Sequence, residues 1–190
     1  MFKSRYGALW AAVAVVTVTT VAAQPARADT CAASTTCSTT VTFSVSAGAG
    51  LTITVPDGPV SVGTGSPGGS ISGTIGSVTV TDARTALTAT WVAQVSATDF
   101  TTGGGTPSET VANSRISYWS GNAVTTGTGT FVAGQPNAGS AVVLDQVRVA
   151  YSKTTGSGNN SAAWTPTIVV DVPAQAVAGI YTGTVRHSVA

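Results

Sequence analysis

Apolar and polar residues alternate along much of the chain, and this alternation predicts β-strands. It is clearest in residues 41–45, 51–55 and 87–97. Because successive side chains of a strand point to opposite faces, each of these segments would bury one face and expose the other. In the longest of them, the apolar face carries Trp91 and Val95, and Thr, Gln and Ser lie opposite. We therefore expect strands that each cover one side of a core.

Glycine and proline divide the rest of the chain into further short strands. We predict these at residues 60–63, 70–75, 77–81, 115–119, 141–151, 164–172 and 180–189. Gly76 separates two of them, and Pro166 interrupts another, which favours an edge strand or a bulge there. One helical turn is expected at residues 173–179. About ten short strands with Gly-rich turns predict an all-β fold, an antiparallel β-sandwich of the Greek-key or immunoglobulin-like type.

Residues 1–28 have the organisation of a signal peptide. Basic residues near the start precede an uncharged run rich in Ala and Val, and Ala26 and Ala28 supply small residues before a cut. A membrane anchor is the alternative, but a spanning helix needs about 20 apolar residues, and this run is shorter and contains several threonines. We predict export with cleavage before Asp29, or alternatively after Ala23.

The exported chain would have two parts. Residues 29–40 form a short N-terminal segment, and residues 41–190 form a single β-sandwich domain. Cys31 and Cys37 fall in the first part, and in an exported chain such a pair predicts a disulfide that closes a small loop. A metal site would need further Cys or His ligands nearby, and the sequence has none there.

Composition excludes several classes of partner. Only 8% of the residues are charged and 43% are hydrophobic, so disorder driven by excess charge is not expected. The formal net charge of +1 includes Lys3, Arg5 and Arg27, and their removal with the leader leaves the exported chain slightly acidic. The basic footprint of a nucleic-acid-binding protein is absent from this sequence. We expect no nucleic-acid partner and no membrane span after cleavage of the leader.

The sequence gives little indication of a catalytic site. A Ser-His-Asp site would have to use His187, the one histidine, and no Gly-x-Ser-x-Gly motif precedes a predicted helix. Glu109 is the one glutamate, and nothing singles out a pair of carboxylates for glycoside hydrolysis. A calcium site built from Asp and loop carbonyls stays open, although EF-hand spacing is missing. The sequence predicts a non-catalytic protein without a cofactor.

Three stretches together resemble a known family. Residues 78–84 contain an Asp-x-Arg turn after a strand, residues 91–100 form a Trp strand that ends in Phe, and residues 172–185 contain an Ala-Gly-x-Tyr-x-Gly hairpin. Their order and spacing resemble the WxL-type (Trp-x-Leu) surface domains of Gram-positive bacteria. The naming motif reads Trp-Val-Ala at residues 91–93 and His-Ser-Val at residues 187–189.

The resemblance implies a β-sandwich that attaches non-covalently to peptidoglycan, often alongside other surface proteins, and that has no catalytic activity. The richness of this chain in Ala, Thr, Gly and Val is typical of secreted actinomycete proteins. The chain would therefore be a divergent actinobacterial member of that family.

Two aromatic rings are candidates for contact with a wall polymer, because a flat ring can stack on a sugar. They are the outward ring of the adjacent pair Tyr118 and Trp119, for which Trp119 is the candidate, and the ring of Trp164. Tyr118 and Trp119 are adjacent, so in a strand one ring points inward and the other outward. Trp164 lies next to Pro166 and a polar loop, and it is the second candidate.

Three further residues are weaker candidates for the same surface. Trp91 lies on the apolar face of its strand, and Tyr181 and His187 share one face of the last strand with apolar residues. We expect Trp91 and Tyr181 to belong to the core, and His187 to be a neutral, hydrogen-bonded histidine that faces inward or packs at the end of a sheet.

The function predicted from these observations is that of a secreted, extracellular protein associated with the cell wall through peptidoglycan or another wall polymer. The alternative is a structural or adhesive subunit that pairs with other surface proteins through sheet edges, because its Thr- and Ser-rich faces carry few of the charges that guard edges. A secreted hydrolase is the third hypothesis, and the single histidine argues against it.

Overall fold

The computed structural model describes residues 32–46, 48 and 50–190. The described residues divide into two units between Phe43 and Ser44, and each unit is treated by itself. The predicted signal peptide and Cys31 lie outside the described residues. Cys37 is described and is not a free cysteine, but its predicted pairing with Cys31 stays a prediction. None of the helices in the described ranges is long and apolar enough to cross a membrane.

The predicted strand at residues 41–45 is not present. These residues have no regular secondary structure, and Val41, Phe43 and Val45 are 80%, 88% and 76% exposed. Alternation indicates which face of a strand would be buried, but a strand forms only where a neighbouring strand supplies hydrogen bonds. The prediction of a strand here was therefore wrong.

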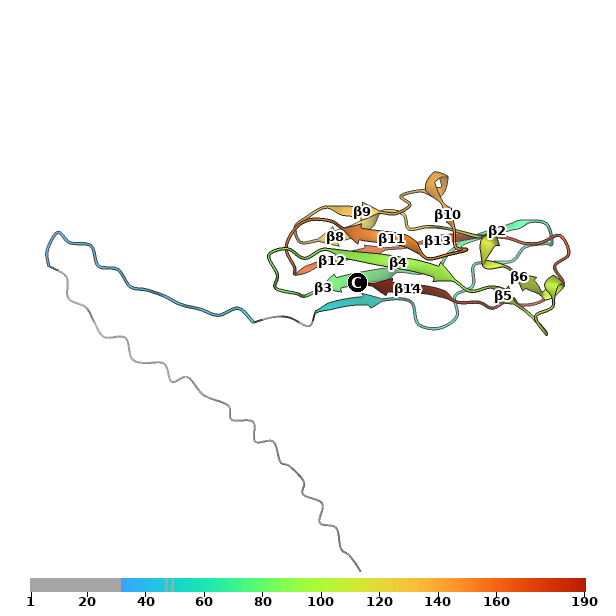
Figure 1. Ribbon diagram of the computed structural model, residues 1–190, viewed down its shortest axis with the longest axis horizontal. Coiled ribbons are helices and arrows are strands. Elements are labelled where there is room, and N and C mark those ends of the chain that lie inside the picture. The colour runs from blue at the N-terminus through green and yellow to red at the C-terminus, as the bar shows by residue number, and fades with distance from the viewer. Residues whose placement is uncertain (1–31, 47, 49) are drawn as a thin grey trace, which may run out of the picture. The chain divides into compact units, whose positions relative to one another are not determined.

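Strands make up nearly all the secondary structure of residues 44–190, as predicted for an all-β fold (Figure 1). They are β1 (Leu51–Thr54), β2 (Ser70–Thr74), β3 (Val78–Asp82), β4 (Trp91–Ala97), β5 (Phe100–Thr101), β6 (Thr110–Val111), β7 (Ile116–Trp119), β8 (Ala123–Thr126), β9 (Phe131–Ala133), β10 (Val142–Val143), β11 (Arg148–Lys153), β12 (Asn160–Trp164), β13 (Thr167–Asp171) and β14 (Val185–Val189). The 3-10 helices are η1 (Pro107–Glu109), η2 (Asn113–Arg115) and η3 (Ala138–Ser140). The helical turn expected at residues 173–179 and the strand expected at residues 60–63 are not formed.

The strands form antiparallel sheets whose neighbours are mostly not consecutive in the chain. Sheet 1 has the order β1-β3-β12-β8, sheet 2 has β10-β7-β13-β2, and sheet 3 has β14-β4-β11-β9. Strands β5 and β6 form a separate ribbon. The result is an antiparallel β-sandwich with crossovers between its sheets.

Sheets 1 and 2 together make one bent layer, because three chain segments run from one sheet into the other. β2 leads into β3, β7 into β8, and β12 into β13, and the order of these pairs is the same in both sheets. At the bend, the Ile75 N–H donates to the Pro166 carbonyl at 3.1 Å. This hydrogen bond continues the pairing of the two chain segments from one sheet into the other. Gly76 has a φ of +87° there, a conformation that favours glycine, so the predicted break at this residue is confirmed.

Pro166 does not mark an edge strand, which was one of the two predicted alternatives. Both β12 and β13 are inner strands of their sheets, and Pro166 lies buried between them. Proline lacks the N–H that a ladder requires, so it is tolerated where one ladder ends and the next begins. The predicted interruption of the strand is confirmed, and the edge alternative was wrong.

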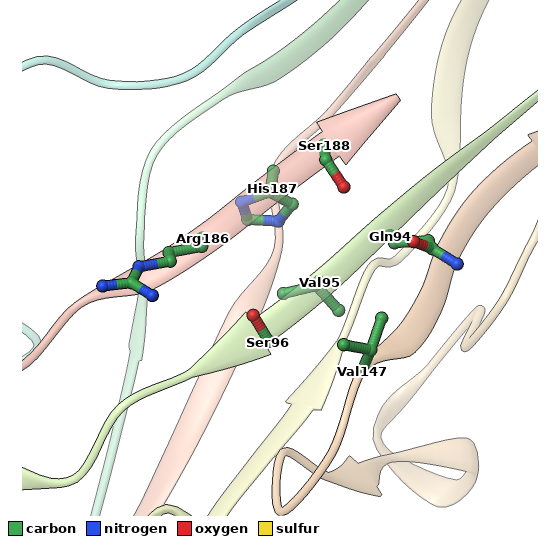
Figure 2. A pocket seen from close by; sticks show the side chains of 7 residues that line it. All are labelled: Gln94, Val95, Ser96, Val147, Arg186, His187 and Ser188. Carbon is green, nitrogen blue, oxygen red and sulfur yellow. The ribbon is translucent and has the colours of Figure 1, made fainter. Parts of the chain in front are cut away.

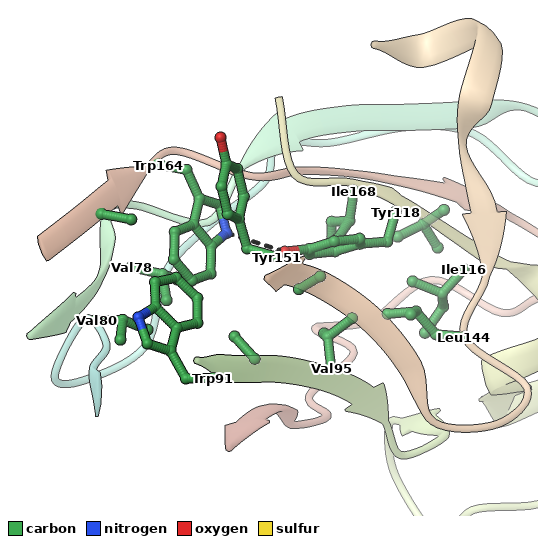
Figure 3. Packing of buried hydrophobic residues seen from close by; sticks show 14 of the residues in the cluster. Val78, Val80, Trp91, Val95, Ile116, Tyr118, Leu144, Tyr151, Trp164 and Ile168 are labelled. Carbon is green, nitrogen blue, oxygen red and sulfur yellow. Dashed lines mark hydrogen bonds between the residues drawn. The ribbon is translucent and has the colours of Figure 1, made fainter. Parts of the chain in front are cut away.

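The core lies between this bent layer and sheet 3 (Figure 3). Sheet 3 contributes Trp91 and Val95, sheet 1 contributes Trp164, and sheet 2 contributes Tyr118 and Ile168. Each of these side chains is at most 1% exposed. Burial of large apolar and aromatic side chains on both inner faces is the main force that holds the layers together.

We expect Ile168→Ala to lower the free energy of unfolding by about 2–5 kcal/mol, because it leaves a cavity in a packed core. Val124→Ala is the control, since Val124 is 79% exposed and its truncation should change stability by less than about 0.5 kcal/mol. Denaturant titration of both variants measures the difference, and equal effects would contradict the described core.

Candidate functional site

The candidate residues occupy very different environments. Trp91 and Trp164 are each 1% exposed, so neither ring presents a face to a ligand. The Trp91 indole N–H donates to Oδ1 of Asn160 at 3.0 Å, and the Trp164 ring stacks on Tyr151 with centroids 5.1 Å apart. The prediction that Trp91 belongs to the core is confirmed. The interpretation of Trp164 as an exposed platform was wrong, because Pro166 beside it lies at an internal bend.

Tyr118 and Trp119 point to opposite faces of β7, as predicted. Tyr118 is fully buried, and its hydroxyl accepts a hydrogen bond from the Trp164 indole N–H at 3.3 Å. Trp119 is half-buried on the outer face of sheet 2, where Thr167 is its partner across the strand pair. Among the five predicted ligand-binding candidates, Trp119 is the one whose ring lies on an outer face.

Tyr181 fixes the segment that leads into β14. Its ring is half-buried against the core, and its hydroxyl donates toward the carbonyls of Ser108 and Val177, at 3.1 and 3.0 Å. Next to it, Thr182 forms a bridge with Thr101. These contacts give Tyr181 a structural role at the start of the last strand.

His187 faces inward from β14. Its Nε2 lies 3.3 Å from the Tyr118 hydroxyl, and the two rings are 5.9 Å apart between centroids. Burial lowers the pKa of His187 to about 4, so the imidazole is neutral at neutral pH. The prediction that His187 faces inward and is hydrogen-bonded is confirmed.

The outer face of sheet 3 contains an open depression of about 290 Å³ beside His187 (Figure 2). Gln94 and Ser96 come from β4, Arg186 and Ser188 from β14, and Val147 from the segment before β11. The register pairs Arg186 with Ser96 and Ser188 with Gln94, so four polar side chains share this face. The depression therefore combines one cation, one amide and two hydroxyls with the side chains of Val95, Val147 and His187.

Arg186 supplies the positive charge of the depression. Its side chain is exposed, and the ion pairs within the described part of the chain involve Arg84 and Arg148 instead. A guanidinium offers a planar set of N–H donors that matches a carboxylate or a phosphate. Gln94 adds an amide that both donates and accepts. These groups suit a ligand with an acidic group beside amides or hydroxyls.

Groups of three or more His, Cys, Asp or Glu that would hold a metal ion do not occur among the described residues. Comparison of the chain with family models and with curated proteins finds no match. The likeness to the Trp-x-Leu surface domains therefore stays a prediction from the motifs.

The alternation of β4 and β14 correctly places Gln94, Ser96, Arg186 and Ser188 on outward faces. However, the sequence does not reveal that β4 and β14 are neighbours, and only this pairing brings the four side chains together. Residues 94–96 and 186–188 are far apart in the chain, so no local spacing signals their meeting.

Stability should fall in mild acid because of His187. Its pKa of about 4 in the folded protein lies below the ordinary 6.5, so folding favours the neutral ring. This contribution is complete above pH 6.5, and it is lost as the pH falls toward 4, by about 1–3 kcal/mol.

The measurement is the free energy of unfolding between pH 7 and pH 4, determined by denaturant titration. The control is His187→Gln, whose amide can still bond to Tyr118 but does not titrate. If the free energy of unfolding changed with pH in the same way in the wild type and the variant, the loss of stability in acid could not be attributed to His187.

Proposed function

We propose that this protein is a secreted, non-catalytic surface domain that binds a cell-wall polymer, peptidoglycan in the first place, through the depression on the outer face of sheet 3. The observation that carries the proposal is the exposed Arg186, which lies outside the ion pairs of the described residues and lines a hollow together with Gln94. The predicted leader and the resemblance to wall-binding domains support the location.

The chemistry of peptidoglycan matches this surface. Its stem peptides carry carboxylates and amides, and its sugars carry hydroxyl and acetamido groups. Arg186 would pair with a carboxylate, and Gln94 with an amide of the same stem. The hydroxyls of Ser96 and Ser188 would bond to neighbouring polar groups, and Val147, 58% exposed, would cover an apolar part of the ligand.

The test is a pull-down of the purified exported chain with washed, protein-free cell walls. We expect saturable binding by the wild type, and Arg186→Gln should weaken it about 10- to 100-fold, because a charge-assisted bond is lost. Arg115→Gln is the matched control, since Arg115 is also exposed but lies away from the depression. Absence of wild-type binding, or equal loss in both variants, would contradict the proposal.

Trp119 offers an independent check of the position of the binding surface. It lies on the outer face of sheet 2, whereas the depression belongs to sheet 3. We expect Trp119→Ala to leave wall binding unchanged in the same pull-down. Loss of binding in this variant alone would move the site to sheet 2 and to stacking on a sugar ring.

A second function, assembly with other surface proteins through sheet edges, is favoured by one observation. The edge strand β8 carries no charge, and its Val124 is 79% exposed. Charged side chains are a common protection of such edges, so β8 can accept another strand. Light scattering over a range of concentrations would show oligomers that Val124→Lys abolishes, with no binding to walls.

A further inference from the structure

Lys153 is buried at the end of the sandwich although it carries an amine. Its side chain is 1% exposed, and Nζ donates to the carbonyls of Ala89 and Ser157, at 2.8 and 2.9 Å. Burial of a lysine is costly unless the group is paired or neutral. Desolvation lowers the pKa of Lys153, which favours the neutral, nucleophilic amine.

Asn160 lies beside this amine and is also buried, with 3% exposure. Its Nδ2 donates to the Ser157 carbonyl at 3.1 Å, so the amine of Lys153 and the amide of Asn160 share one acceptor. Since the distances to the shared oxygen are 2.9 and 3.1 Å, the two nitrogens are separated by at most the sum of these distances, about 6 Å. Lys153 ends β11 in sheet 3, and Asn160 begins β12 in sheet 1.

Two neighbours hold the Asn160 amide at both of its polar atoms. The Trp91 indole N–H donates to Oδ1 at 3.0 Å, and Nδ2 donates to Oδ2 of Asp82 at 3.1 Å. Asp82 is fully buried, and Arg84 donates to both of its oxygens, at 2.7 and 2.9 Å. The ion pair of Asp82 and Arg84 at the Asp-x-Arg turn is thus part of a larger network.

Together with Lys153, the residues around the Asn160 amide have the roles that an amide exchange at Cγ of Asn160 requires. An N–H donor on Oδ1 would stabilise the negative charge that develops when the carbonyl carbon is attacked. The Asp82 carboxylate accepts a hydrogen bond from Nδ2, the nitrogen that must leave. The bonds from Arg84 lower the pKa of Asp82, so this group is held as a carboxylate beside Nδ2 of Asn160.

We propose that Lys153 and Asn160 join in an intramolecular isopeptide bond within the folded protein. Nζ of the neutral amine attacks Cγ of Asn160, and a new C–N bond forms. Asp82 takes a proton from the attacking nitrogen and returns it to Nδ2, the Cγ–Nδ2 bond breaks, and ammonia leaves. The reaction neither oxidises nor reduces any group and needs no co-reactant.

The bond would join sheet 3 to sheet 1 and close the loop of residues 154–159 covalently. Such a cross-link restricts the unfolded chain in the way a disulfide does, without sensitivity to reduction. The inference does not depend on the proposed function, because it concerns only the interior of the sandwich.

The test is a tryptic map of the full chain after reduction and denaturation, analysed by mass spectrometry. Trypsin does not cleave after an acylated lysine, so we expect one peptide of residues 149–186, lighter than its sequence mass by one ammonia. Unmodified peptides of residues 149–153 and 154–186 would overturn the proposal. Succinimide formation at Asn160 also releases ammonia, but it leaves Lys153 open to cleavage, so that result would overturn it too.

Two variants test the roles of the residues. Asn160→Asp should give a cross-linked peptide of the same mass, because water leaves in place of ammonia. Asp82→Asn should give the two uncross-linked peptides, with folding checked by circular dichroism. A cross-link that persists in folded Asp82→Asn would overturn the role of Asp82, and the wild-type map decides the bond itself if that variant does not fold.

Discussion

The aromatic side chains of the core carry polar atoms, and each of these atoms needs a partner away from water. This constraint links the three main sheets. The Trp164 indole of sheet 1 donates to the Tyr118 hydroxyl of sheet 2, which contacts the His187 ring of sheet 3. The Trp91 indole of sheet 3 donates to Asn160 of sheet 1. Because an unpaired buried polar group costs about 1–3 kcal/mol, these bonds define how the layers align.

The same arrangement determines which residues can meet a ligand. Since Trp91, Trp164 and Tyr118 are used inside, the outer faces carry mostly Thr, Ser and small residues, with few charges. Against so neutral a surface, the cation of Arg186 is conspicuous. Under the proposed function, Arg186 would supply the charge for recognition of an acidic polymer, because it is the cation that lines the depression.

A group of buried polar and ionisable side chains lies at one end of the sandwich. Asp82, Asn160 and Lys153 are all buried there, although each has a polar or ionisable group. In a stable domain such groups are retained where they form bonds with one another, and here they connect β3, β12 and β11. The network therefore ties sheet 1 to sheet 3 at this end of the sandwich.

Alternation and turn residues alone determined the all-β class, the break at Gly76, the burial of Trp91 and the opposite directions of Tyr118 and Trp119. These properties depend on the two-residue period of a strand and on local backbone conformation, which neighbouring residues set. Tertiary structure decided the rest. Residues 41–45 alternate but have no strand, Pro166 lies at an internal bend, and Arg186 lines the same depression as Gln94. Each of these outcomes depends on which distant strands pair, and a local pattern carries no information about a distant partner.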